Sequence, residues 1–440
     1  MSAAPTDEQD PVHDILGVGF GPSNLALAIA IDEHNRSVAE PERLDCAFFE
    51  AQPRFGWHRG MLIEGTTMQV SFLKDLVTMR NPASDFSFLS YLHDRRRLAD
   101  FINHKTMFPT RVEFHDYLEW AADRVAHVVR YDSEVVGITP GAEWFEVEVR
   151  CGGRTRTHRA RNVVLALGLQ ASVPEGAELG ERVWHNLDLL HRVDALRGGD
   201  PRRFVVVGAG QSAAETTDYL HRTFPAAEVC AVFSRYGHTP ADDSPFANRI
   251  FDPQAVDDFY AAPEDVKQLL LDYHRNTNYS VVDLDLIEEL YGRVYQEKVL
   301  GRQRLRILNA SRVGAVEPRP DGVRVAVDFL PTGRRTVLDA DVLVYATGCR
   351  PRDPFRLLGD TARCCARDDL GRLHVERDYR VRTTDDLPGG LYLQGGTEHT
   401  HGITSSLLSN SAVRAGEIRD SILAHRTAAS RERDFATSLA

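Results

Sequence analysis

The chain has 440 residues, of which 42% are hydrophobic and 26% are charged. This is the composition of a folded globular protein, and the length is enough for two or three domains. The formal net charge of −12 argues against nucleic acid as a partner, because phosphate binding needs a basic face.

The N-terminal segment is polar and acidic, and no apolar run approaches the ~20 residues that span a bilayer. We therefore expect a cytoplasmic protein that does not contact the membrane. The six cysteines form no C-x-x-C pair, so no metal site and no dithiol redox centre is predicted. The polar ends at residues 1–11 and 427–440 are expected to be disordered tails.

The first predicted unit begins with a short apolar strand at residues 14–18 that runs into a glycine turn. A helix follows at about 25–31, and a second strand at 46–49 ends in an acid. In such a dinucleotide-binding unit the helix amides face a pyrophosphate, and the acid accepts a hydrogen bond from a ribose hydroxyl. Proline replaces the third glycine of the usual G-x-G-x-x-G. The residues predicted to bind this cofactor are Gly17, Gly19, Gly21, Pro22, Ser23 and Glu50.

The same pattern begins again at Phe204, where a β-branched strand leads into a G-x-G-x-x-A turn. No acid follows the second strand of this unit, and Ser234 and Arg235 stand there instead. A carboxylate would repel a 2′-phosphate, whereas an arginine binds one, so the pattern favours NADPH over NADH. The residues predicted to bind NADPH are Gly208, Gly210, Gln211, Ser212 and Arg235.

Two other segments place small residues directly after a buried strand. Residues 341–348 end in Ala-Thr-Gly, and residues 162–168 have a similar but less complete pattern, an apolar strand that ends in glycine. Small residues let the backbone approach a bound flavin closely, so Thr347 and Gly348 join the predicted cofactor site. Together with two glycine turns, these segments indicate FAD and a nicotinamide cofactor in one chain.

We therefore predict an α/β fold with two doubly wound, Rossmann-like dinucleotide-binding domains and a smaller, mainly helical substrate section. The FAD-binding domain is expected to be discontinuous, at residues 12–168 and 336–425. The NADPH-binding domain is expected at residues 169–335. It includes the helical section at about 245–300, where apolar residues recur at helical spacing.

Between about residues 12 and 420, five motifs in order resemble those of the microbial N-hydroxylating flavoprotein monooxygenases, and within them the L-ornithine N5-hydroxylases. The motifs are W-H-x-G-M at 57–61, M-Q-V-S-F-L-K-D-L at 68–76, D-S-P-F-x-N-x-x-F at 243–251, N-T-N-Y-S-V-V at 276–282, and the segment 401–409. Arg249 stands where relatives usually carry Glu or an amide, which leaves the identity of the amine open. Cys349 replaces an aromatic residue that is common after Ala-Thr-Gly.

The resemblance implies a monooxygenase that uses FAD, NADPH and O2 to convert L-ornithine into N5-hydroxyornithine, through a C4a-hydroperoxyflavin. It places the enzyme in siderophore or other nonribosomal peptide biosynthesis, and it implies a homo-oligomer, often a tetramer. A lysine or diamine hydroxylase is the alternative within the family, and a flavin-binding protein without catalysis is the alternative outside it. A flavin disulfide reductase would need a C-x-x-C or C-x4-C pair, and the chain has neither.

The resemblance also assigns roles to residues of the motifs. We expect Lys74 to bind the carboxylate of the substrate, and Asn248 and Asn278 to bind its remaining polar groups. Gln69 is expected beside the flavin ring and Ser409 beside the reacting amine, so these two are the predicted catalytic residues. The predicted substrate-binding residues are Lys74, Asn248, Asn278, Leu407 and Ser409. The remaining predicted flavin contacts are Trp57, His58, Met61 and Gln69.

Overall fold

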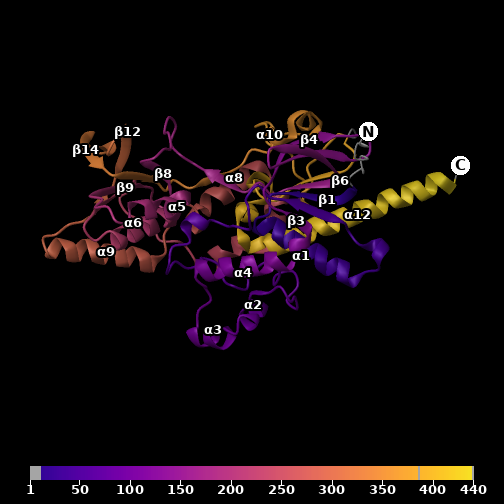
Figure 1. The fold of residues 1–440 in the computed structure, drawn as a ribbon, viewed down its shortest axis with the longest axis horizontal. Helices are drawn as coiled ribbons and strands as arrows, with labels where there is room; N and C mark the ends of the chain where they lie inside the picture. The colour runs from indigo at the N-terminus through magenta and orange to yellow at the C-terminus, as the bar shows by residue number, and fades with distance from the viewer. Residues whose placement is uncertain (1–10, 385–386, 439–440) are drawn as a thin grey trace, which may run out of the picture.

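The computed structural model describes residues 11–384 and 387–438 and is an elongated α/β molecule. One nucleotide-binding unit lies toward each end of the long axis, with the helical segment that contains α8 near the middle (Figure 1). Each unit contains parallel strands, and a glycine turn follows the strand at residues 12–18 in the first unit and the strand at residues 203–207 in the second. The predicted fold class is therefore confirmed.

The first unit is built on a seven-stranded sheet in the order β3-β2-β1-β6-β5-β4, with β17 also paired to β6. The strands β3, β2, β1, β6 and β17 run parallel, whereas β4, β5 and β6 form an antiparallel meander. The long strand β6 serves both parts. The bounds are β1 (Val12–Val18), β2 (Cys46–Phe49), β3 (Val129–Arg130), β4 (Ser133–Pro140), β5 (Phe145–Cys151), β6 (Arg154–Leu165) and β17 (Gly390–Leu393).

Helices α1 and α12 pack against each other beside this sheet, and α12 continues beyond the body of the molecule (Figure 1). The centre of α1, from Leu25 to Ile31, is apolar and wholly buried, and its side chains form part of the hydrophobic core of this unit. Aromatic side chains hold the smaller helices α2, α3 and α4 together, with Phe88 in contact with five other rings. The helices are α1 (Pro22–Ser37), α2 (Phe88–Asp94), α3 (Leu98–His104), α4 (Arg111–Arg124) and α12 (Ser411–Ser438).

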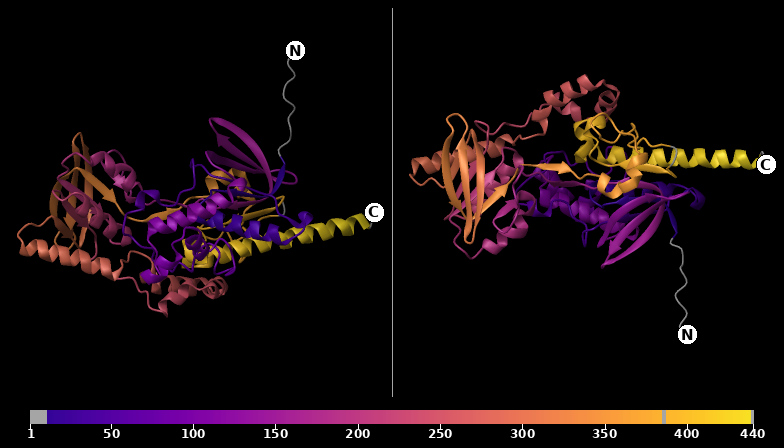
Figure 2. Two further views of the ribbon diagram at one scale, coloured as in Figure 1. Left: turned by 60° about the horizontal axis from the view of Figure 1, so that its bottom comes forward. Right: turned by 90° about the horizontal axis from the view of Figure 1, so that it is seen from above.

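The second unit has a five-stranded parallel sheet in the order β11-β10-β9-β15-β8. Its strands are β8 (Val183–His185), β9 (Arg203–Val207), β10 (Glu228–Val232), β11 (Leu305–Leu308) and β15 (Val342–Tyr345). Its helices are α5 (Leu189–Val193), α6 (Gln211–Thr223) and α9 (Leu284–Val299). A separate antiparallel sheet covers this unit at the end of the molecule (Figure 2), with strands β12 (Ser311–Arg319), β13 (Gly322–Phe329) and β14 (Arg334–Ala340).

The strand β15 corrects one predicted domain boundary. We expected residues 336–425 to belong to the first unit, but β15 pairs with β8 and β9 of the second sheet. The return to the first unit comes later, through the antiparallel pair β7 (Leu169–Ala171) and β16 (Cys349–Pro351). The similar segment at residues 162–168 begins in β6 of the first unit. Each unit therefore carries one strand that ends in small residues.

The segment expected to be helical at 245–300 contains α7 (Pro253–Ala261), α8 (Glu264–Tyr273) and α9. Two further short helices are α10 (Phe355–Leu358), which follows β16, and α11 (Glu398–His401), which precedes α12. The predicted C-terminal tail at 427–440 is wrong for most of its length, because α12 continues to Ser438. Of the predicted N-terminal tail, residues 1–10 lie outside the described residues.

Candidate active site

A single large cavity of about 2240 Å³ lies where the two units meet. Sites for one drug-sized ligand usually measure roughly 300–1,000 Å³, so this cavity has room for more than one bound molecule. It is lined by parts of both glycine turns, by the segment 66–71, by Lys74, and by residues 407–409 and Ser411. Most of the sequence-predicted residues therefore meet in one place.

The first glycine turn brings the start of α1 to this cavity. A Cβ at Gly17 would lie 2.1 Å from the Phe48 ring, and one at Gly19 would lie 2.5 Å from the carbonyl oxygen of Ala166. Gly19 also has a φ of +80°, which few other residues adopt. Gly21 precedes α1 and has open space on its Cβ side. Gly17 is therefore a packing position, while Gly19, Gly21, Pro22 and Ser23 line the cavity.

Glu50 lies at the end of β2 and also lines the cavity. Its carboxylate accepts hydrogen bonds from the amides of Phe20 at 2.7 Å and Gln52 at 2.8 Å. These bonds fix the carboxylate and leave lone pairs free on both oxygens. The side chain can thus accept a further hydrogen bond, as expected for a ribose contact.

The second glycine turn repeats this construction. A Cβ at Gly208 would lie 2.2 Å from the carbonyl oxygen of Ala346, just as Gly19 approaches Ala166 in the first unit. Gly210 packs against Ser280, where a Cβ would be 3.2 Å from its Cα. Gly208 and Gly210 shape the turn, whereas Gln211 and Ser212, in the first turn of α6, line the cavity.

Besides the packing glycines Gly17, Gly208 and Gly210, the predicted cofactor residues Thr347 and Arg235 do not line the cavity. The Thr347 hydroxyl donates to the carbonyl of Ser172, although the neighbouring Gly348 does line the cavity. The exposed Arg235 donates to Thr239 Oγ1 at 3.1 Å and to the Ser280 carbonyl at 2.9 Å. Arg235 follows β10 in the second unit, where a nucleotide ribose lies in this type of fold.

The segment of Trp57, His58 and Met61 closes the cavity from the first unit. All three residues line it, and the Trp57 and His58 rings lie 5.1 Å apart. Met61 is buried and packs against the core of the second unit. A Cβ at Gly60 would lie only 1.8 Å from the carbonyl oxygen of Leu187, which explains the glycine of the W-H-x-G-M motif.

The predicted substrate residues Lys74, Asn248 and Asn278 all line the cavity. The Lys74 ammonium lies 5.9 Å from the ring centroid of Phe251, which belongs to the same 3-10 helix as Asn248, Ala247–Phe251. Within the described parts of the chain, no carboxylate pairs with Lys74. Its ammonium is therefore free to bind an anionic group in the cavity.

Backbone hydrogen bonds join the two segments that carry Asn248 and Asn278. Asn248 Nδ2 donates to the Asp243 carbonyl at 2.9 Å, and Asp242 N donates to the Asn276 carbonyl at 3.0 Å. The motifs at 243–251 and 276–282 therefore lie side by side. Arg249 turns away from this site: its side chain is 73% exposed and is 3.9 Å from Asp252.

Gln69 begins a hydrogen-bond network that joins the two units. Its Nε2 donates to Asp283 Oδ1 at 3.0 Å, and Gln211 Nε2 donates to Asp283 Oδ2 at 2.9 Å. Gln211 Nε2 also donates to Glu215 at 2.9 Å, and Glu215 accepts a bidentate pair from Arg111 at 2.7 and 2.8 Å. Gln69 and Arg111 come from the first unit, and the other three residues from the second.

Sequence reasoning missed Arg111, Glu215 and Asp283, although all three line the cavity. Asp283 directly precedes α9, so a helix-start signal was readable at that position. Arg111 and Glu215 are separated by 104 residues, and no sequence pattern links them. Gln394 was also missed; it lines the cavity with a buried Oε1 that has no hydrogen-bond partner.

Ser409 and Leu407 lie in the segment between α11 and α12, and both line the cavity. The segment turns at Gly402, whose φ is +75°. Ser409 is buried in a 3-10 helix of residues Leu408–Asn410. Cys349, the other departure from the expected motifs, lines the cavity beside Gly348.

Buried His401 lies at the start of this segment, and we expect it to make the stability of the folded protein depend on pH. Its ring stacks on Tyr379 at 4.1 Å, and burial lowers the pKa of the imidazole from 6.5 to about 3. Below pH 6.5 the unfolded chain binds a proton that the folded chain does not, so stability falls as the pH falls toward 3. We expect a loss of up to about 1.4 kcal/mol per pH unit from this group.

Urea unfolding midpoints measured between neutral and acidic pH check this prediction. His401→Gln should flatten the acid side of the stability profile, whereas His104→Gln, at an exposed position of α3, should not. An unchanged profile in His401→Gln would show that another group causes the acid sensitivity.

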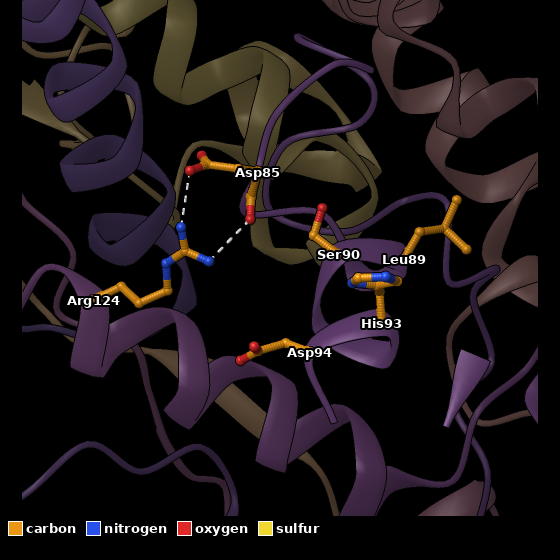
Figure 3. A pocket seen from close by; sticks show the side chains of 6 residues that line it. All are labelled: Asp85, Leu89, Ser90, His93, Asp94 and Arg124. Carbon is orange, nitrogen blue, oxygen red and sulfur yellow. Dashed lines mark hydrogen bonds and ion pairs between the residues drawn. The ribbon is translucent and has the colours of Figure 1, made fainter. Parts of the chain in front are cut away.

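A second hollow, of about 410 Å³, lies on the first unit between α2 and α4 (Figure 3). The Arg124 guanidinium donates to the carboxylate of Asp85 at 2.8 Å and to its carbonyl at 3.2 Å. The same arginine packs over the rings of Phe86 and Trp120. The charged groups Arg124 and Asp85 of this hollow therefore pair with each other, and Asp94 accepts a hydrogen bond from Trp120 Nε1 at 2.8 Å.

Among the described residues, no helix is both long and apolar enough to cross a bilayer. Over the same residues, groups of three or more His, Cys, Asp or Glu side chains that could hold a metal ion are absent.

The chain is similar to proteins of known activity. The sequence profile of the family described as L-lysine 6-monooxygenase/L-ornithine 5-monooxygenase matches residues 11–351. The L-ornithine N(5)-monooxygenase of Burkholderia cepacia is 42% identical, over 90% of this chain and 91% of that protein.

Two solved structures have the same fold over nearly the whole chain. One is the Kutzneria sp. 744 ornithine N-hydroxylase, KtzI-FADred-NADP+-L-orn, with a TM-score of 0.91 and 49% identity over 94% of this chain and 100% of that one. The other is the ornithine hydroxylase PvdA from Pseudomonas aeruginosa, with a TM-score of 0.88 and 35% identity over 94% of this chain and 100% of that one.

Proposed function

The chain belongs to the L-lysine 6-monooxygenase/L-ornithine 5-monooxygenase family, and on this basis we propose that it is an FAD- and NADPH-dependent L-ornithine N5-monooxygenase. The resemblance expected from the five sequence motifs is thereby confirmed. The proposed reaction consumes O2 and yields N5-hydroxyornithine. A hydroxylamine of this kind is a precursor of hydroxamate groups, which fits a role in siderophore or other nonribosomal peptide biosynthesis.

One observation carries this proposal: a single cavity connects the start of α1, the start of α6 and the Lys74 ammonium. Two helix N-termini are two positions for the pyrophosphates of dinucleotides. The lysine in the wall of the same cavity is a position for the carboxylate of an amino acid.

The residues of the first unit fit FAD. Gly21 and Gly168 line the cavity with open space on their Cβ side, so a cofactor can approach the backbone closely there. Gln394 of the first unit, and Asn186 directly after β8 of the second unit, line the cavity. Each has a buried side-chain oxygen without a hydrogen-bond partner, and a cofactor can supply the missing donors. Bound flavin supplies the activation of dioxygen with electrons from NADPH.

The chain's own residues would bind and orient the amino acid. Lys74 would bind the carboxylate, and Asn248 and Asn278 would bind the α-ammonium and the second carboxylate oxygen. Leu407 and Ser409 would border the side-chain amine. Gln69, held by Asp283, would stand beside the flavin ring. A buried pocket wall also excludes water and favours the unprotonated amine, which is the form that reacts.

Product analysis tests the proposal. The purified protein is incubated with FAD, NADPH, O2 and L-ornithine, and mass spectrometry should detect one added oxygen on the side-chain nitrogen. Parallel reactions with L-lysine, putrescine and cadaverine decide among the amines of the family. Equal yields from the diamines would contradict the role of Lys74, and peroxide without hydroxylamine would indicate an uncoupled oxidase.

Nucleotide selectivity gives a separate prediction for Arg235. This arginine follows β10 at the ribose position of the second unit. Arg235→Ala should therefore weaken the binding of NADPH by about tenfold and the binding of NADH much less. The measurement is the KM for each nucleotide in flavin reduction. An equal rise of the KM for NADPH and for NADH would show that Arg235 does not recognise the 2′-phosphate.

Three further properties belong to the proposal. We place the FAD site in the first unit and the NADPH site in the second, with the change of unit after β15. All six cysteines are free thiols, which fits a reducing compartment and supports a cytoplasmic location. Exposed Tyr291, Tyr295 and Val299 form an apolar stripe on α9 that supports self-association, which light scattering can measure.

A further inference from the structure

Arg414 is a charged side chain buried on α12, with 2% of its surface exposed. Its Nη1 donates to the Ser405 carbonyl at 2.6 Å. Its Nη2 donates to Ser23 Oγ at 3.1 Å and to Ser411 Oγ at 3.4 Å. All three partners are neutral. Taking a cation out of water costs several kcal/mol, and such groups usually pair with a carboxylate.

The acid one turn further along α12 does not supply this partner. Both oxygens of Glu417 accept hydrogen bonds from Arg377, at 2.8 and 3.1 Å. Arg414 Nε has no hydrogen-bond partner, and the Tyr379 ring centroid lies 6.0 Å from the guanidinium carbon. Across the described residues, the positive charge of Arg414 therefore has no ion-pair partner.

The partners of Arg414 lie in the wall of the cavity or directly beside it. Ser23 is in the first turn of α1, and Ser411 begins α12; both line the cavity. Ser405 is two residues before Leu407 and four before Ser409, which also line it. One guanidinium thus ties the start of α1 to the segment that carries Ser409. It also adds positive charge to a helix N-terminus that already favours anions.

We propose that Arg414 is a positioning residue with two effects on the monooxygenase reaction. Its hydrogen bonds hold the segment of Leu407 and Ser409 against α1, so that this segment borders the reacting amine. Its unpaired charge strengthens the binding of the FAD pyrophosphate at the α1 N-terminus. This inference rests on the proposed function, in which α1 is the helix that binds the flavin.

Two substitutions separate the two effects. Arg414→Lys keeps the charge but lacks the planar fork that reaches Ser405 and Ser23 together. Arg414→Gln removes the charge. Arg419→Lys and Arg419→Gln are matched controls on the same helix, because the Arg419 side chain contacts Asp420 and the Ala30 carbonyl instead.

The readouts are the Kd of the apoprotein for FAD, from flavin fluorescence, and the KM and kcat for ornithine at saturating FAD. Arg414→Lys should raise the ornithine KM by about tenfold and change the FAD Kd by less than about threefold. Arg414→Gln should weaken FAD binding by at least about tenfold. Both control variants should match the wild type in both measurements.

If Arg414→Gln does not fold, Arg414→Lys alone decides. An Arg414→Lys protein with a lowered Tm but an unchanged ornithine KM would overturn the inference, because it would assign Arg414 only to stability. A wild-type protein that binds no FAD would overturn the proposed function together with this inference. An active wild type whose Arg414 variants keep normal FAD and ornithine constants would overturn the inference alone.

Discussion

Lys74→Ala is expected to raise the KM for ornithine by about 100-fold while flavin reduction by NADPH stays nearly unchanged. The substitution removes the one charged group of the predicted amino-acid site, and a charge-assisted hydrogen bond contributes about 1.5–3 kcal/mol. By about 1.4 kcal/mol for each tenfold change, this corresponds to about 10- to 150-fold. The start of α6, where NADPH is proposed to bind, is untouched by the change. Steady-state kinetics and stopped-flow flavin reduction measure the two quantities separately.

Comparison with a diamine makes this test sharper. Putrescine lacks the carboxylate, so its rate should be nearly the same in the Lys74→Ala protein and in the wild type. Lys267→Ala is the matched control, because this lysine lies on α8 over the rings of Phe259 and Tyr260 and does not line the cavity. An unchanged ornithine KM in the Lys74→Ala protein would show that Lys74 does not bind the substrate.

The two nucleotide units could be predicted because their determinants are local. A glycine turn between a strand and a helix is encoded within about ten residues, and the acid that follows is at a fixed distance. The structure places Gly19, Glu50 and Gln211 on one cavity, as these patterns indicate. The motif of Lys74 was predicted from resemblance alone, since the local chemistry of one lysine after an apolar run does not identify a ligand.

The parts that sequence reasoning did not give depend on contacts between distant segments. The domain boundary at residue 336 was wrong because an apolar strand before small residues looks the same in either sheet. Only the pairing of β15 with β9 shows to which unit it belongs. Thr347 was likewise predicted at the cavity from its motif, whereas its hydroxyl is bound to the Ser172 carbonyl. The C-terminal tail was predicted from its polar composition, yet α12 continues through it to Ser438.

Arg111→Met is expected to destabilise the protein by about 3–5 kcal/mol and to lower its Tm by on the order of 10 °C. The side chain of Glu215 is only 3% exposed, and Arg111 is the cation that pairs with it across the two units. Burial raises the pKa of Glu215 and Arg111 opposes that rise, so removing Arg111 leaves a buried carboxylate without compensation. Thermal melts measure the loss. Arg150→Met, which breaks the exposed pair with Glu134, is the control and should cost less than about 1 kcal/mol.

The pH dependence of this loss identifies its cause. In the Arg111→Met protein the folded state binds a proton at Glu215 more readily than the unfolded state does, so stability rises as the pH falls below the raised pKa. The deficit relative to wild type should therefore be smaller near pH 5.5 than near pH 8.

The double substitution Arg111→Met/Glu215→Leu separates the stability of the ion pair from its role in the reaction. With no charge left to bury, the double variant should regain most of the lost Tm. It should still reduce flavin more slowly than wild type, by about tenfold, because the two units are no longer fixed by a bidentate contact and a small misplacement of reactants is costly. A double variant as unstable as Arg111→Met would show that the unpaired carboxylate is not the cause. Wild-type flavin reduction in the double variant would show that the ion pair stabilises the junction without aligning the two cofactors.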